Sequence, residues 1–266
     1  EGLWLVNKRN DAHAGPAGIS GLGEDAPPGI SQDRLDLFGE ASGACYALRA
    51  LWKSIGPRVL TGRKEAEPGR KVVGYMPIYV PRELIHAAGM LPLGIVGGGD
   101  QLEVIHGDAY YQSYICRIPR STIELGVSGR LDFVDGMLFP SICDVIRNLS
   151  GMWKLMFPKV YSRYFDVPQN YRDDIGGNFY INELAELRHD LGELRGKPVT
   201  DDELRSSIAV YNDNRKLVRE LYALRAERPW QAPAAEVYLM VRAGLLLPIE
   251  EHSALLRDYL AAARAE

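Results

Sequence analysis

The chain has 266 residues, and its 35 acidic side chains outnumber its 31 lysines and arginines, which gives a formal net charge of −4. Nucleic-acid binders need a basic surface to displace counterions, so this balance argues against that class. Hydrophobic residues make up 46% of the chain and charged residues 25%, enough to bury the core of one large or two modest domains. No apolar run is long enough to span a bilayer, and the first ten residues lack the layout of a signal peptide, so we expect a cytoplasmic protein without a membrane partner.

The beginning of the chain carries the weakest pattern. Gly, Ala and Pro are frequent between residues 11 and 28 and no apolar period is visible there, so residues 1–32 are predicted to form a loose N-terminal segment. Residues 33–70 are predicted to form one helix, which contains Cys45, and a linker that follows it.

Short apolar runs alternate with helical patterns between residues 71 and 172. Strands are predicted over 71–76, 91–96, 133–139 and 160–165, and helices over 81–90, 109–127 and 142–156. This alternation is typical of parallel βαβ units with right-handed crossovers, and it predicts a four-stranded Rossmann-like or flavodoxin-like α/β domain. In such sheets, ligands bind outside the carboxyl ends of the strands.

Residues 173–266 are predicted to form an all-helical region. Leucines at helical spacing mark a helix over 182–194, and Thr200-Asp-Asp-Glu203 is a capping box that begins the next helix. Two further helices are predicted over 236–246 and 250–263.

The three cysteines are Cys45, Cys116 and Cys143, and so odd and sparse a count argues against a disulfide framework. Cys143 directly follows a predicted strand at the start of a helix, where backbone N–H groups favour the thiolate, the form that binds metals. Cys116 falls within the 109–127 helix or its first turns. The alternative interpretation is that both thiols are small buried hydrophobic residues, which the lack of a closely spaced cysteine pair favours.

Glu83 and His86 are three residues apart on the helix predicted over 81–90, so they share one face near the carboxyl end of the first strand. A buried Glu–His pair would serve as a proton donor or relay. A surface pair without catalytic role explains the spacing equally well.

Several runs resemble the 2-hydroxyacyl-CoA dehydratase family, and within it the ATP-dependent benzoyl-CoA reductases. They are Lys71-Val-Val-Gly-Tyr-Met-Pro77, Pro81-Arg-Glu-Leu-Ile-His-Ala-Ala-Gly89, Tyr114-Ile-Cys116 and Asp135-Gly-Met-Leu-Phe-Pro-Ser-Ile-Cys-Asp144. The resemblance extends over roughly residues 64–266.

This resemblance implies that Cys116 and Cys143 are two of three cysteine ligands of a [4Fe–4S] cluster, as a single or a double cubane. The family's third ligand lies in a second α/β domain, so we expect the chain to be truncated before that domain, and we do not assign the third ligand to Cys45. The resemblance also implies that Glu83 lies near the cluster, with a proton-handling or positioning role.

The implied function is that of an iron–sulfur-cluster-bearing subunit of a benzoyl-CoA reductase, which accepts low-potential electrons for reductive dearomatisation of the CoA thioester. The implied partners are a homologous cluster-bearing subunit and an ATPase or activator module, which binds the ATP in place of this chain. Two alternatives stay open: a subunit of a 2-hydroxyacyl-CoA dehydratase with a ketyl radical mechanism, and a cluster-free scaffold subunit.

Overall fold

The structure is a computed structural model that describes residues 69–98 and 102–265. The predicted N-terminal segment, the predicted helix with Cys45 and nearly all of the linker lie outside the described residues.

The described residues divide into two compact units. Those up to Tyr211 form one unit, here called the sheet unit, and those from Asn212 onward form the other, the helical unit. The contacts therefore group the first helices after residue 173 with the sheet, and the division predicted between 71–172 and 173–266 stays a prediction.

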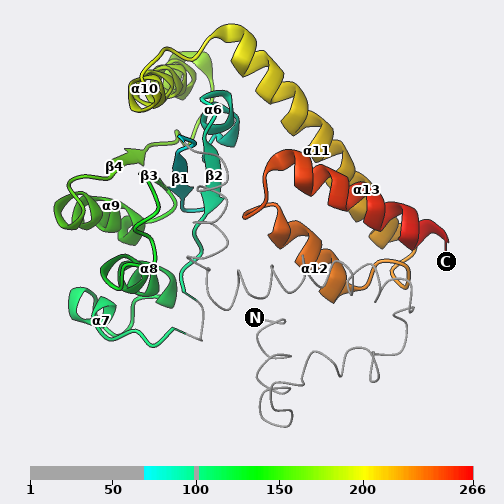
Figure 1. The fold of residues 1–266 in the computed structure, drawn as a ribbon, viewed down its shortest axis with the longest axis horizontal. Coiled ribbons are helices and arrows are strands. Elements are labelled where there is room, and N and C mark those ends of the chain that lie inside the picture. Colours follow the sequence, from blue (N-terminus) through cyan, green and yellow to red (C-terminus); the bar gives the residue numbers. More distant parts are fainter. Residues whose placement is uncertain (1–68, 99–101, 266) are drawn as a thin grey trace. The chain divides into compact units, whose positions relative to one another are not determined.

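Four parallel strands form the sheet, in the order β2-β1-β3-β4 (Figure 1). They are β1 (Val72–Tyr75), β2 (Leu91–Gly94), β3 (Gly136–Pro140) and β4 (Tyr161–Phe165). β1 pairs with β2 from Val72 opposite Leu91 and with β3 from Val73 opposite Gly136, and β3 pairs with β4 from Gly136 opposite Tyr161. The predicted α/β class, with a parallel four-stranded sheet followed by helices, is confirmed.

The strand sequences fit these positions. Every residue of β1, β2 and β3 is buried, as expected for parallel strands covered on both faces, and this explains their continuous apolar runs. Pro92 lacks an N–H group, and it lies in β2, which has one neighbouring strand among the described residues. An edge strand tolerates proline because no ladder hydrogen bond is lost on the open side.

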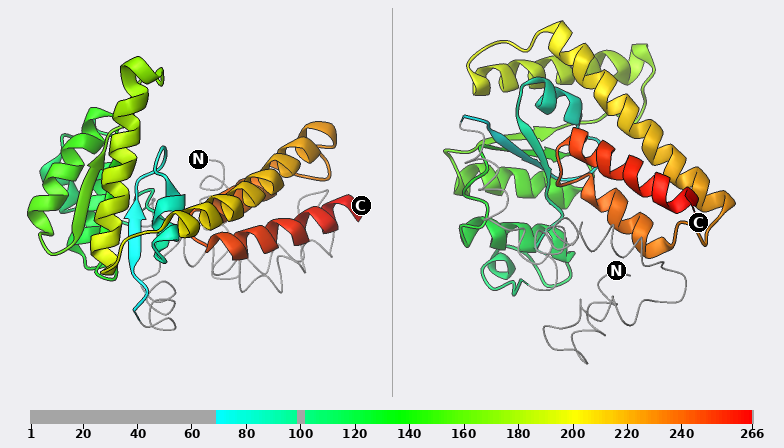
Figure 2. Two further views of the ribbon diagram at one scale, coloured as in Figure 1. Left: turned by 90° about the horizontal axis from the view of Figure 1, so that it is seen from above. Right: turned by 45° about the vertical axis from the view of Figure 1, so that its right-hand side comes forward.

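Helices cover both faces of the sheet (Figures 1 and 2). The sheet unit contains α6 (Arg82–Ala87), α7 (Gly107–Tyr110), α8 (Arg117–Val127), α9 (Asp144–Met156), the π-helical turn η1 (Asp173–Gly177), α10 (Asn178–Arg195) and the beginning of α11 (Asp201–Glu227). Alternate residues of β4 point to opposite faces: Arg163 contacts carboxylates of α10, whereas Tyr164 contacts Arg147 of α9. A Cβ atom at Gly126 of α8 would lie 2.7 Å from the Phe157 ring, so glycine there permits the close approach of α8 and α9.

The prediction of a single helix over residues 109–127 is wrong. The chain forms α7 and α8 instead, because Tyr111 and Cys116 adopt extended ψ angles of 147° and 150° that end one helix and precede the next. Pro119 lies in the first turn of α8, where its missing N–H group costs no hydrogen bond. A proline at this place indicates a helix that starts near residue 117.

Arg163 holds α10 against β4. Its guanidinium lies 2.9 Å from Asp190, 2.8 Å from Glu186 and 3.2 Å from Glu183, and the Tyr161 hydroxyl donates to Asp190 over 2.7 Å. These contacts hold α10 on the face of the sheet opposite to α9.

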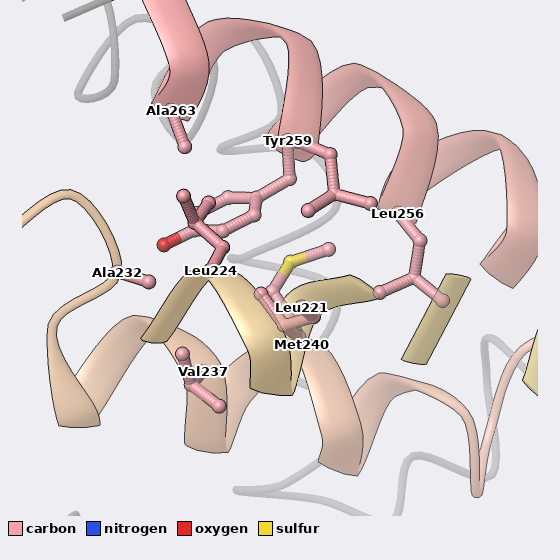
Figure 3. Close-up of a cluster of buried hydrophobic side chains, with 9 residues drawn as sticks. Leu221, Leu224, Ala232, Val237, Met240, Leu256, Tyr259 and Ala263 are labelled. Atoms are coloured by element: carbon pink, nitrogen blue, oxygen red, sulfur yellow. The ribbon is translucent and has the colours of Figure 1, made fainter. Parts of the chain in front are cut away.

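The helical unit combines the rest of α11 with α12 (Ala234–Ala243) and α13 (Ile249–Ala265), close to the predicted helices. Figure 3 shows its core, in which Leu221, Leu224, Val237, Met240, Leu256 and Tyr259 pack together. Buried polar contacts accompany this core: the Tyr259 hydroxyl donates to Glu236 over 2.6 Å, and His252 Nε2 lies 2.9 Å from the carbonyl of Met240.

The predicted capping box at the start of α11 is confirmed. The Glu203 N–H donates to the Thr200 hydroxyl over 3.2 Å, and the Thr200 N–H donates to the Glu203 carboxylate over 2.8 Å. The Arg195 guanidinium also donates two hydrogen bonds to this carboxylate, over 2.7 and 3.0 Å. The Arg195 guanidinium, helped by the Thr200 N–H, lowers the pKa of Glu203 to about 2.

We expect Thr200→Ala to lower the free energy of unfolding by about 1 kcal/mol, because it removes an N-cap hydroxyl. Thr200→Ser, which keeps the hydroxyl, is the matched control. Urea unfolding at pH 7 measures both variants, and equal stabilities for Thr200→Ala and wild type would contradict the capping role.

Acid should remove the contribution of Glu203. Because its pKa is lower in the folded chain than its ordinary value of 4.5, this stabilisation is present above about pH 4.5 and is lost as the pH falls toward 2. The difference in urea midpoint between wild type and Glu203→Gln should therefore shrink over this window. A difference independent of pH would contradict the ion pair.

Candidate functional site

Two cysteines begin two helices at the same edge of the sheet. Cys143 follows the carboxyl end of β3 and is the N-cap residue of α9, and Cys116 is the N-cap residue of α8. Since α8 and α9 each lead back to the start of a parallel strand, both helices begin at the carboxyl edge. Both thiols are free and exposed, which contradicts the alternative that they are buried core residues.

Local hydrogen bonds fix the backbone around Cys143. Cys143 has an extended backbone and is the last residue before α9. Its carbonyl accepts the N–H groups of Ile146 at 3.1 Å and Arg147 at 3.2 Å, and these are the first hydrogen bonds of α9. Two residues earlier, the Ser141 N–H donates to the carbonyl of Phe165 and the Ser141 hydroxyl accepts the N–H of Val167 over 2.8 Å. The loop that carries Cys143 is therefore tied to the end of β4.

A buried carboxylate fixes the segment before Cys116. Glu124 of α8 accepts the N–H groups of Ile105, His106 and Gly107 at 3.0, 2.7 and 2.9 Å, and His106 Nδ1 lies 3.0 Å from its other oxygen. Burial raises the pKa of Glu124, but these hydrogen bonds outweigh that effect and the pKa is lowered. The carboxylate therefore satisfies the N–H groups at the start of α7 and binds α7 to α8.

Glu83 and His86 both lie on α6, as predicted, and the contacts of His86 are with α11. His86 Nδ1 lies 2.9 Å from the Ser207 hydroxyl, which itself donates to the carbonyl of Glu83 over 2.8 Å. Because the Ser207 hydroxyl donates its hydrogen to the Glu83 carbonyl, it accepts from His86, so Nδ1 of His86 carries the hydrogen. The His86 ring also packs edge-on against Tyr211. These contacts join α6 to α11, and a catalytic role for Glu83 or His86 stays a prediction.

Exposed apolar side chains surround the carboxyl edge. They lie after β1, β3 and β4 and at or just before the start of α8, and Tyr79 among them has a φ of 64°, which is uncommon for a residue other than glycine. The set comprises Ile78, Tyr79, Tyr114, Ile118, Ile142 and Tyr171. This edge therefore combines soft sulfur ligands with apolar surroundings.

The two cysteines fit a metal cluster in part. Thiolates are the ligands that iron–sulfur clusters prefer, and helix N-termini favour the thiolate form. Among residues 69–98 and 102–265, however, no group of three or more His, Cys, Asp or Glu side chains is placed to hold a metal ion. Cys116 and Cys143 would thus supply two ligands and need at least one more.

Comparison with known proteins identifies the family. Residues 77–266 match the family model described as 2-hydroxyglutaryl-CoA dehydratase, D-component. The chain belongs to this family. Glu83, His86, Cys116 and Cys143 all lie within the matched region, and the resemblance inferred from the sequence is confirmed.

Individual relatives differ widely in their similarity to the chain. It is 74% identical to the C subunit of benzoyl-CoA reductase from Thauera aromatica over 200 residues, which are 75% of this chain and 52% of that protein. It is 32% identical over 77% of its length to the beta subunit of (R)-2-hydroxyglutaryl-CoA dehydratase from Acidaminococcus fermentans, and 31% identical over 76% to the beta subunit of lactoyl-CoA dehydratase from Anaerotignum propionicum. Of these two relatives the matches cover 54% and 53%, so the chain spans about half the length of the curated relatives it matches.

None of the described helices combines the length and the apolar character needed to cross a membrane.

The sequence reasoning missed two residues of this site, Tyr111 and Glu124. The single helix predicted over residues 109–127 contains both, so it hides the loop between α7 and α8 and the carboxylate that binds the start of α7. Recognition of Pro119 as a first-turn residue would have revealed the loop.

We expect Glu124→Gln to lower the free energy of unfolding by about 2 kcal/mol, because charge-assisted hydrogen bonds to three N–H groups and an imidazole are weakened. Glu103→Gln, at an exposed position a few residues before α7, is the matched control. Urea unfolding measures both, and an effect of Glu124→Gln no larger than that of the control would contradict the role of Glu124.

Proposed function

We propose that this chain is part of the iron–sulfur-cluster-bearing subunit of an ATP-dependent benzoyl-CoA reductase. The observation that carries the proposal is the 74% identity to the C subunit of a benzoyl-CoA reductase, against 32% and 31% to the two dehydratase subunits. The two exposed cysteines at the carboxyl edge of the sheet support it, because they are the ligand type that a cluster requires.

In this proposal Cys116 and Cys143 bind two iron atoms of a [4Fe–4S] cluster, and a residue of the family's second α/β domain, not Cys45, supplies the third ligand. The cluster, as a single or double cubane, would supply one-electron transfer at low potential to the CoA thioester. Both cysteines are N-cap residues, Cys116 of α8 and Cys143 of α9. The exposed apolar side chains of the carboxyl edge would exclude water from the bound acyl group.

The remaining groups have supporting roles. Glu83 would position a group near the cluster or handle a proton. Its charge also acts on Tyr180 of α10, whose pKa is raised first by burial and then by the charges of Tyr171 and Glu83. His86 would support Glu83 through Ser207, which contacts both residues. ATP is bound by a partner ATPase, and the complex includes a second, homologous cluster-bearing protein. A cytoplasmic location stays a prediction.

The two dehydratase relatives provide the second candidate function, a subunit of a 2-hydroxyacyl-CoA dehydratase with a ketyl radical mechanism. Both reactions use an acyl-CoA and the same fold, so the fold does not separate them. ATP-dependent reduction of benzoyl-CoA favours the reductase, and reversible dehydration of a 2-hydroxyacyl-CoA favours the dehydratase.

We expect Cys116→Ser and Cys143→Ser each to lose most of the iron and at least about 100-fold of the benzoyl-CoA reduction, since loss of a ligand or its support typically costs 10–100-fold or more. The full-length subunit is purified anaerobically with its partners, and iron, acid-labile sulfide and ATP-dependent reduction are measured. Cys45→Ser is the matched control and should retain both.

The other outcomes of this experiment distinguish the alternative functions. Retention of iron and reduction in both variants would overturn the assignment of these ligands. A complex without iron in any form would favour the cluster-free scaffold subunit, and iron with dehydration but no reduction would favour the dehydratase.

A further inference from the structure

Tyr111 lies where the chain passes from α7 toward Cys116. It is the C-cap residue of α7, and its extended backbone, with φ −136° and ψ 147°, turns the chain into the five-residue approach to α8. The approach is itself closed by a hydrogen bond from the Ile115 N–H to the carbonyl of Gln112 over 3.0 Å. The position of Tyr111 is therefore coupled to that of Cys116 by a short, turned segment.

The other end of this segment is fastened to α8. Glu124 binds the N-terminal N–H groups of α7, and Asp108 of α7 forms a 2.8 Å ion pair with Arg120 of α8. Because α7 is attached to α8 at two points, Tyr111 has a defined position relative to the start of α8.

The side chain of Tyr111 reaches the second cysteine-bearing helix. Its hydroxyl donates a long hydrogen bond, 3.4 Å, to the carbonyl of Val145, which lies in the first turn of α9 two residues after Cys143. One half-buried phenol thus joins the segment before Cys116 to the turn after Cys143.

The electrostatics agree with this placement. Burial raises the pKa of Tyr111, and the charges of Cys143 and then Cys116 raise it further. This direction agrees with the position that the hydrogen bond to the Val145 carbonyl gives the phenol.

We propose that Tyr111 is a positioning residue that sets the separation of the Cys116 and Cys143 thiols by joining the approach to α8 with the first turn of α9. Neither the family match nor the names of the relatives assign this role. Its consequence for a cluster rests on the proposed function: the Tyr111 hydroxyl contacts the first turn of the helix that Cys143 begins, and a neutral hydroxyl in the surroundings of a cluster stabilises the more negative, reduced state and raises the reduction potential.

The separation of the thiols is tested without iron. The full-length chain with Cys45→Ser is freed of iron and treated with a short bis-maleimide, which links Cys116 to Cys143. The cross-linking ratio is the rate of this linkage divided by the rate at which a single maleimide labels the same thiols. Tyr111→Ala should lower this ratio about fivefold, the factor that corresponds to one intramolecular hydrogen bond of about 1 kcal/mol. Tyr110→Ala, which changes the exposed neighbouring tyrosine, is the matched control and should leave the ratio unchanged.

The effect on a cluster is tested in the assembled complex. Tyr111→Phe keeps the ring and removes only the hydroxyl, so it should retain iron while its EPR-monitored midpoint potential shifts to a more negative value; Tyr110→Phe should not shift it. A purely structural role of the tyrosine ring would leave the potential of Tyr111→Phe unchanged.

A cross-linking ratio of Tyr111→Ala equal to that of the parent chain would overturn the proposal, and so would an unshifted potential in Tyr111→Phe. A parent complex without iron would instead overturn the proposed function, and cross-linking would still decide the role of Tyr111.

Discussion

The parallel pairing of the four strands is the constraint on which the rest of the sheet unit depends. Because all strands point the same way, their carboxyl ends lie at one edge, and the chain must return by a helix before each next strand. Each returning helix begins with N–H groups that have no partner within the helix. Cys116 and Cys143 occupy the starts of two such helices, so the fold brings two thiols that are 27 positions apart in the sequence to one edge of the sheet.

Polar contacts behind this edge determine how precisely the thiols are placed. Glu124 binds α7 to α8, Ser141 ties the loop before Cys143 to the end of β4, and Arg163 holds α10 against the same strand. Such groups are costly to leave without hydrogen bonds once they are buried, so each contact restricts the loops to few conformations. The proposed ligands Cys116 and Cys143 lie on two different helices, so their separation would depend on supports of this kind.

The sequence was sufficient for the strands and insufficient for the site contacts. The first three strands are recognisable because a short apolar run ends at a Pro or Gly, as at β1 before Pro77. Hydrophobic periodicity did not reveal the break between α7 and α8, because backbone angles at Tyr111 and Cys116, and not the apolar pattern, end and begin those helices. The spacing of Glu83 and His86 correctly put them on one helix. The partner of His86, however, lies 121 residues away in the chain, and no local pattern encodes such a contact.

The central claim is that one cluster is bound by thiols from two helix starts, and residue-specific alkylation tests it most directly. The iron-loaded complex is treated anaerobically with iodoacetamide, and each cysteine is located by mass spectrometry before and after iron is removed with a chelator. The account predicts that Cys116 and Cys143 are both protected while iron is bound and both modified, as exposed thiols, once it is removed. Equal modification of both cysteines in the iron-loaded and iron-free complexes would contradict it.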